Sequence, residues 1–233
     1  MRRFVVVALL AIACVALLVS CNDASDTVSK RQYDNLYAHL SYMWAQALSH
    51  ADATIAFYGD SRVVGASWND AFADSEVVNL GVGGDKVKDL ITRLPLLDNL
   101  NCLSTVVLAI GGNDCLSNSF DIEEFERQYD SLLAALKQKG LTVYVNTVAG
   151  ICSGTVTSDQ KSIASANDKI HKANAVIITL AAKYDMTVID MAQIMDNADF
   201  SLKAEYASDG VHFNEAGNEV WYEALRIYIP TAD

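Results

Sequence analysis

The sequence is short of proline, of basic charge and of cysteine, and each shortage narrows the class of protein. Only two of the 233 residues are proline and 52% are hydrophobic, so long disordered tracts are excluded. Lys and Arg number 17 against 29 Asp and Glu, a balance that repels nucleic acid. The length suits one α/β domain with a full core and is short for two.

Motifs for metals and dinucleotides are also missing. The five cysteines form no CxxC pair and the four histidines are scattered, so we expect no metal site. A dinucleotide-binding loop would need another glycine three residues after Gly83, where the chain has Lys86. A Rossmann fingerprint is therefore excluded.

The N-terminus has the pattern of an export signal. Arg2 and Arg3 precede an apolar run over residues 4–19, which is shorter than the roughly 20 residues that span a bilayer. The run leads to Cys21 in the order Leu-Val-Ser-Cys and resembles the bacterial lipobox, whose cysteine is lipidated and becomes the first mature residue. An ordinary signal peptide, or a membrane anchor with an incidental cysteine, is the alternative.

The lipobox predicts an exported lipoprotein anchored in the bacterial cell envelope, with a signal peptide over 1–20 and a tether over 21–30. Without the two arginines of the signal, the chain keeps 15 basic and 29 acidic side chains, a net charge of −14. A lipid on Cys21, and not a basic patch, would then hold it at the membrane. The remaining cysteines, which allow at most one internal disulfide, are Cys102, Cys115 and Cys152.

Apolar, β-branched segments alternate with longer helical patterns, which is typical of βαβ units. Strands are expected over 54–58, 76–80, 105–110, 142–147 and 187–190. Helices are expected over 30–49, 85–97, 122–139, 160–183 and 215–228. This order predicts an α/β fold, a three-layer α/β/α sandwich around a parallel sheet of about five strands. The functional loops of such a sheet follow the carboxyl ends of its strands.

Residue types suited to acyl transfer follow the first three strands. Ser61 lies in a Gly-Asp-Ser-Arg turn that can present its hydroxyl above the sheet, although a serine there is usually a helix cap. After the second strand, Gly81, Gly83 and Gly84 let the backbone approach a ligand or simply make a turn. After the third strand, Asn113 can donate a hydrogen bond into the same cleft or belong to a plain Asn-Asp turn.

A fourth feature precedes the last helix. Asp209 and His212 stand three residues apart, so a hydrogen bond between them could fix the imidazole tautomer and let the histidine accept a serine proton. Such pairs also occur in plain loops. All four features, however, fall where an α/β sheet places its active site, and together they are far more specific than any one.

In this order the four blocks resemble the SGNH hydrolase family, which includes the GDSL esterases. The blocks are Gly59-Asp60-Ser61, the stretch from Asn79 to Gly84, Gly112-Asn113-Asp114, and Asp209 to His212. The resemblance extends from about residue 53 to the end and assigns residues 31–233 to an SGNH hydrolase domain. It implies a flavodoxin-like sandwich and a serine esterase that needs no cofactor.

The resemblance also implies a role for each residue. Ser61 would be the nucleophile, His212 the base and Asp209 the group that orients the base. The oxyanion hole would consist of the N–H groups of Ser61 and Gly84 and the side chain of Asn113. Gly84 is preferred to Gly81 because the family's donor glycine directly precedes an Asp or similar polar residue.

The substrate stays open at this stage. Where the family often has an apolar residue after the serine, this chain has Arg62; we expect a solvated side chain, with a contact to an anionic or sugar substrate as the alternative. An enzyme outside the cytoplasm meets polysaccharides and lipids more often than acyl-CoA, which favours a small-acyl (acetyl) carbohydrate ester. The alternatives are a thioesterase or lysophospholipase acting on longer acyl chains, or a non-catalytic binding lipoprotein of the envelope.

Overall fold

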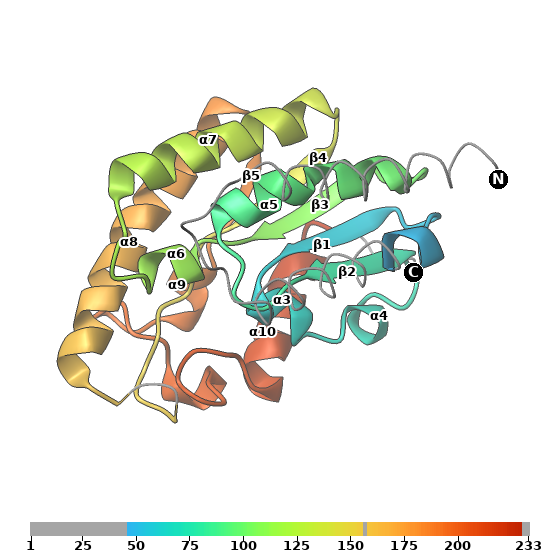
Figure 1. Ribbon diagram of the computed structural model, residues 1–233. Coiled ribbons are helices and arrows are strands. Elements are labelled where there is room, and N and C mark those ends of the chain that lie inside the picture. The colour runs from blue at the N-terminus through green and yellow to red at the C-terminus, as the bar shows by residue number, and fades with distance from the viewer. Residues whose placement is uncertain (1–45, 156–157, 230–233) are drawn as a thin grey trace, which may run out of the picture. The chain divides into compact units, whose positions relative to one another are not determined.

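The computed structural model describes residues 46–155 and 158–229, and these contain a five-stranded sheet (Figure 1). Every neighbouring pair of strands is parallel, in the order β2-β1-β3-β4-β5. The strands are β1 (Ile55–Gly59), β2 (Val77–Gly81), β3 (Thr105–Ala109), β4 (Thr142–Asn146) and β5 (Thr187–Ile189). The predicted α/β class and its strands are thereby confirmed, each strand within a residue or two.

Three long helices and several short ones lie between the strands or follow the last of them. The long helices are α7 (Ile122–Gln138), α8 (Gln160–Lys183) and α10 (Glu215–Arg226). The short ones are α3 (Ser61–Val64), α4 (Trp68–Ala71), α5 (Val87–Arg93), α6 (Gly112–Cys115) and α9 (Met191–Met195), with 3₁₀ turns η1 (Leu94–Asn99) and η2 (Ala204–Tyr206). The signal peptide, the tether and residues 30–45 of the first expected helix lie outside the described residues.

The two faces of the sheet are covered by different helices because side chains alternate along each strand. Ala56 and Tyr58 of β1 belong to a core cluster with residues of α5, α7 and α8. Ile55 and Phe57 point the other way, into a second cluster with residues of α4, α9 and α10. All five residues of β1 are buried, as expected for a central strand covered on both faces. These layers form the predicted α/β/α sandwich.

Aromatic packing anchors the second layer to the sheet. Phe57 and Trp68 stack with ring centroids 3.7 Å apart, and Trp221 of α10 meets Trp68 edge-on at 4.8 Å. The indole N–H of Trp221 donates to Asn146 Oδ1 over 2.9 Å at the end of β4. The start of α10, which follows the His212 loop, is therefore fixed relative to the strand ends.

The strand order reverses between β1 and β3. The chain leaves β1 to form β2 on one side of it and then returns to form β3 on the other side. In open parallel sheets a crevice opens at such a switch point, outside the carboxyl ends of the strands. Ser61 follows β1 and Asn113 follows β3, so both lie at this crevice.

Candidate functional site

The turn that carries Ser61 is built from close contacts that leave no room for larger residues. A Cβ on Gly59 would overlap the carbonyl oxygen of Ala109, so only glycine lets β1 and β3 end this close together. Asp60 is the N-cap of α3, and its carboxylate accepts from the Arg62 N–H at 3.0 Å. Ser61 is therefore the first residue of a helical turn directly after the central strand.

The structure brings His212 to Ser61 from 151 residues away. Its Nε2 lies 3.0 Å from Ser61 Oγ, and its Nδ1 lies 2.7 Å from Asp209 Oδ2. The imidazole is 40% exposed and the Asp209 carboxylate 23%, so the pair borders solvent. In this geometry, with the Nδ1 proton facing Asp209, Nε2 is free to accept a proton from the serine hydroxyl.

Asp209 is held as an anion by its surroundings. Desolvation opposes its ionisation, but donors from the His212 amide, the imidazole and the Val211 amide outweigh that effect and lower the pKa of Asp209 to about 2. Both amides donate to Oδ1, which leaves Oδ2 for the imidazole. The carboxylate is thus locked in one orientation and stays charged at any working pH.

The second and third loops meet beside this pair. Asn113 Nδ2 donates to the carbonyl of Asp85 over 2.9 Å, which leaves a second amide hydrogen for another acceptor. A Cβ on Gly83 would lie 3.9 Å from the Ser61 Cβ, so the glycine turn faces the serine. Gly84 has a φ of +84°, and a Cβ placed on it would meet no heavy atom within 4 Å. Four segments predicted from sequence therefore converge at one place.

A small pocket opens next to Ser61. Its empty volume is about 280 Å³, against about 890 Å³ for a cleft between α8 and α9. Apolar side chains form much of the lining, namely Leu116, Val148, Ile151, Ile170 and Val211. The wall beside the serine hydroxyl is therefore largely apolar.

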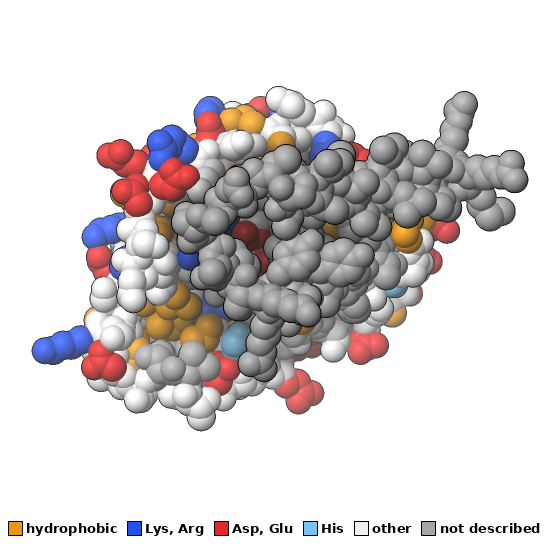
Figure 2. Space-filling model, viewed as in Figure 1, with side chains coloured by type: hydrophobic (Ala, Val, Ile, Leu, Met, Phe, Trp, Pro, Cys, Tyr) orange, Lys and Arg blue, Asp and Glu red, His pale blue; other side chains and the backbone are white. Residues whose placement is uncertain are grey.

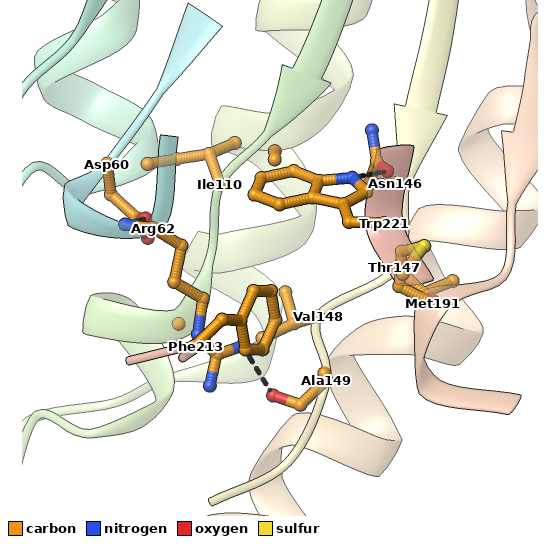
Figure 3. A pocket seen from close by; sticks show the side chains of 12 residues that line it. Asp60, Arg62, Ile110, Asn146, Thr147, Val148, Ala149, Met191, Phe213 and Trp221 are labelled. Carbon is orange, nitrogen blue, oxygen red and sulfur yellow. Dashed lines mark hydrogen bonds between the residues drawn. The ribbon is translucent and has the colours of Figure 1, made fainter. Parts of the chain in front are cut away.

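Arg62 is not the solvated side chain expected from the sequence. Its guanidinium donates three hydrogen bonds to backbone carbonyls, at 2.9 Å to Val211, 2.7 Å to Ala149 and 2.9 Å to Gly150. Figure 3 shows the side chain running from the turn beside Asp60 toward Ala149, with the ring of Phe213 against it at 4.7 Å. The expectation was wrong because the carbonyls that satisfy Arg62 lie in loops 87 to 149 residues away.

A second arginine, Arg93, was missed by sequence reasoning. It is only 5% exposed and donates to Leu80 O, Gly59 O and Asp85 Oδ2 over 2.8–2.9 Å. It thereby ties the ends of β1 and β2 to the residue that follows Gly84. Burial raises the pKa of Asp85 to about 6, although Arg93 lowers it. The one feature of the sequence that could have pointed to Arg93 is its position among the apolar residues on the buried face of an amphipathic helix.

No disulfide contributes to this arrangement within the described ranges. Cys102, Cys115 and Cys152 are free thiols, and Cys115 and Cys152 are buried. Over residues 46–155 and 158–229, no three His, Cys, Asp or Glu side chains are grouped to hold a metal ion. Cys21, the expected lipidation site, lies outside these residues.

An α/β/α sandwich with a serine hydroxyl hydrogen-bonded to an imidazole has the parts that acyl transfer requires. Residues 53–220 match the model of the GDSL-like lipase/acylhydrolase family, and the chain belongs to that family. The resemblance drawn from the four sequence blocks is confirmed. A comparison with curated proteins gives no match.

Solved structures of other proteins share the fold. A GDSL-like lipase from Bacteroides thetaiotaomicron is 20% identical with a TM-score of 0.68, covering 83% of this chain and 96% of that chain. An acetyl xylan esterase, AlAXEase, is 22% identical with a TM-score of 0.60 and coverages of 75% and 98%. Another acetyl xylan esterase, from Geobacillus stearothermophilus, is 19% identical with a TM-score of 0.60 and coverages of 78% and 96%. At these identities the likeness establishes the fold alone.

Proposed function

We propose that the chain is a serine esterase in which Ser61 attacks the ester carbonyl while His212 removes its proton. The observation that carries the proposal is the continuous set of contacts from Ser61 Oγ to His212 Nε2 at 3.0 Å and from His212 Nδ1 to Asp209 at 2.7 Å. Nucleophile, base and orienting carboxylate are the parts that acyl transfer through an acyl-enzyme requires.

The reaction needs only groups of the chain and water. As the Ser61 oxygen bonds to the carbonyl carbon, its proton passes to His212, and the carbonyl oxygen becomes an oxyanion. The amides of Ser61 and Gly84 and the free hydrogen of Asn113 Nδ2 would stabilise that oxyanion; each such donor typically contributes about 100- to 1,000-fold to turnover. His212 then protonates the leaving alcohol as its bond to the carbonyl carbon breaks. In the second half of the cycle, water attacks the acyl carbon while His212 removes its proton, and the proton passes to Ser61 Oγ as the acyl group leaves as a carboxylic acid.

The acyl group is proposed to be small. Ser61 borders a small pocket whose lining is largely apolar, which favours a short acyl group over a long chain. Two proteins with the same fold are acetyl xylan esterases, which favours a carbohydrate ester as substrate. An export signal that ends at Cys21 would place the enzyme in the envelope, where such esters occur.

A panel of p-nitrophenyl esters of increasing acyl length, with acetylated xylan alongside, tests this proposal. We expect kcat/KM to be highest for acetate and to fall as the chain lengthens, with release of acetate from the xylan. Ser61→Ala serves as the background control. A preference for long chains would favour the thioesterase or lysophospholipase alternative, and an inactive wild type would favour the non-catalytic binding lipoprotein.

A further inference from the structure

The Arg62 side chain joins three segments that are remote in sequence. Arg62 belongs to α3, next to Ser61, and its Nη1 and Nη2 donate to Ala149 and Gly150 in the loop after β4. Its Nε donates to the carbonyl of Val211, the residue directly before His212. The planar guanidinium therefore links the serine turn to the histidine loop, and Figure 3 shows Arg62 beside Phe213 with its bond to Ala149.

The loop after β4 is itself a rigid platform. The Gly150 N–H donates to both carboxylate oxygens of Asp196 at 2.9 Å, while its carbonyl accepts from Arg62. Asn167 bonds both polar groups of the Ile151 backbone, at 2.8 and 2.9 Å. Because this peptide is held from both sides, Arg62 bonds to a fixed support and not to a mobile loop.

The histidine loop rests on the same platform. Cys152 N–H donates to the Gly210 carbonyl over 2.8 Å, and a Cβ on Gly154 would overlap the Asp209 backbone. These contacts fix Asp209 and Gly210 but not the distance from Val211 to α3. Among the hydrogen bonds of the described residues, those that join α3 to this loop are Arg62 Nε to Val211 and Ser61 Oγ to His212.

Three acidic side chains lie near Arg62, namely Asp60, Asp196 and Asp209, and the Phe213 ring lies under the guanidinium at 4.7 Å. Three donors in a fixed plane match three carbonyls that converge from two loops. A lysine ammonium is a single donor centre on a flexible stem and cannot reproduce that match.

We propose that Arg62 is a positioning residue that sets the distance between Ser61 Oγ and His212 Nε2 by clamping the Val211 carbonyl to α3. The proposal rests on the serine mechanism above for its kinetic consequence, while its structural consequence stands without it. A displacement of about 1 Å in such a pair can cost about 100-fold in turnover.

Kinetics of Arg62→Met and Arg62→Lys test the consequence for catalysis. Methionine keeps an unbranched stem but removes every donor, so kcat should fall about 100-fold while KM for p-nitrophenyl acetate stays close to the wild-type value. Lysine should restore part of kcat. Arg226→Met is the matched control, since it also removes a guanidinium that lies near a backbone carbonyl, Ala71 O at 3.5 Å. Arg226 is at the end of α10 remote from His212, and its variant should keep the wild-type kcat.

Hydrogen exchange of the peptide over 208–214 tests the consequence for structure, whether or not the chain hydrolyses esters. Arg62→Met should speed exchange there, while Arg226→Met should not, and circular dichroism should show both proteins folded. Unchanged exchange in folded Arg62→Met would overturn the proposal. So would a raised KM with unchanged kcat, which would make Arg62 a substrate contact. An inactive wild type with faster exchange in Arg62→Met would instead contradict the serine mechanism and leave the clamp supported.

Discussion

At the scale of single residues, the assignment depends on keeping Asp209 charged and His212 free to take a proton. The pKa of Asp209 is lowered to about 2 because three donors outweigh its desolvation. That carboxylate therefore titrates far below the pH range in which imidazole groups titrate. A loss of activity on mild acidification therefore has to come from other groups, and burial raises the pKa of Asp85 to about 6 and that of Asp196 to about 7, so variants of the base itself are needed beside the pH series.

We predict that kcat/KM falls on acidification, because the imidazole of His212 accepts the serine proton only in its neutral form. Asp209→Asn should keep the fold and lower turnover, by up to about 10,000-fold as in serine proteases, because an amide can stabilise the wrong tautomer. His212→Ala should cost more than Asp209→Asn. Steady-state kinetics of both variants over a pH series test these roles. If His212→Ala kept nearly wild-type activity while Asp209→Asn was inactive, the assigned roles would be wrong.

Some residues of the site were predictable from sequence and others were not. Ser61, Asn113 and the Asp209–His212 pair stand in short motifs directly after strands or before a helix, so local sequence marks them. Arg62 and Arg93 act on backbone carbonyls up to 149 residues away. The residues around each arginine in the sequence do not indicate these partners, so the hydrogen bonds of Arg62 and Arg93 could be found only in the folded chain.

At the scale of elements, the buried strands and the long helices follow from their patterns. α8 runs over Gln160–Lys183 as predicted, and its N-cap Asp159 accepts from Ser162 N–H. The four-residue helices α3, α4 and α6 were missed, since a single turn has no repeating apolar pattern. The residue patterns alone do not predict the order of the strands, because it depends on pairing across the sheet, but the flavodoxin-like fold implied by the family resemblance has the order observed, 2-1-3-4-5.

One predicted helix is shorter than expected for a definable reason. The pattern favoured a helix over 85–97, but α5 ends at Arg93 and continues as the 3₁₀ turn Leu94–Asn99. Pro95 has no N–H to donate to the preceding turn, so the α-helical ladder cannot pass through it. The change of geometry still leaves Leu94, Leu96 and Leu97 buried, so the layer over the sheet stays closed.

At the scale of the whole molecule, the net charge of the chain does not account for attachment to a membrane. Where described residues are visible in Figure 2, acidic and basic side chains occur on the same face, and the chain carries an excess of acidic residues. No helix within the described residues is long and apolar enough to cross a membrane. From the lipobox-like sequence that precedes Cys21, we propose that a lipid on this residue retains the acidic protein at a membrane.

Detergent phase separation tests the anchor. The protein made in a bacterium with its own signal should partition into the detergent phase, because acyl chains on Cys21 add about 0.8 kcal/mol per buried methylene. Cys21→Ser, compared after removal of the signal in both proteins, should stay in the aqueous phase. Equal partitioning of the two would contradict the lipobox and favour an ordinary signal peptide.

The central claim is that Ser61 is the nucleophile, and covalent labelling tests it most directly. A fluorophosphonate reacts with a serine only where a base activates it, so intact mass spectrometry of the treated protein should show a single adduct. Peptide mapping should then place that adduct on Ser61. The account predicts that Ser61→Ala folds, takes no label and hydrolyses no ester. A Ser61→Ala protein that is still labelled, or that still hydrolyses p-nitrophenyl acetate, would contradict the account.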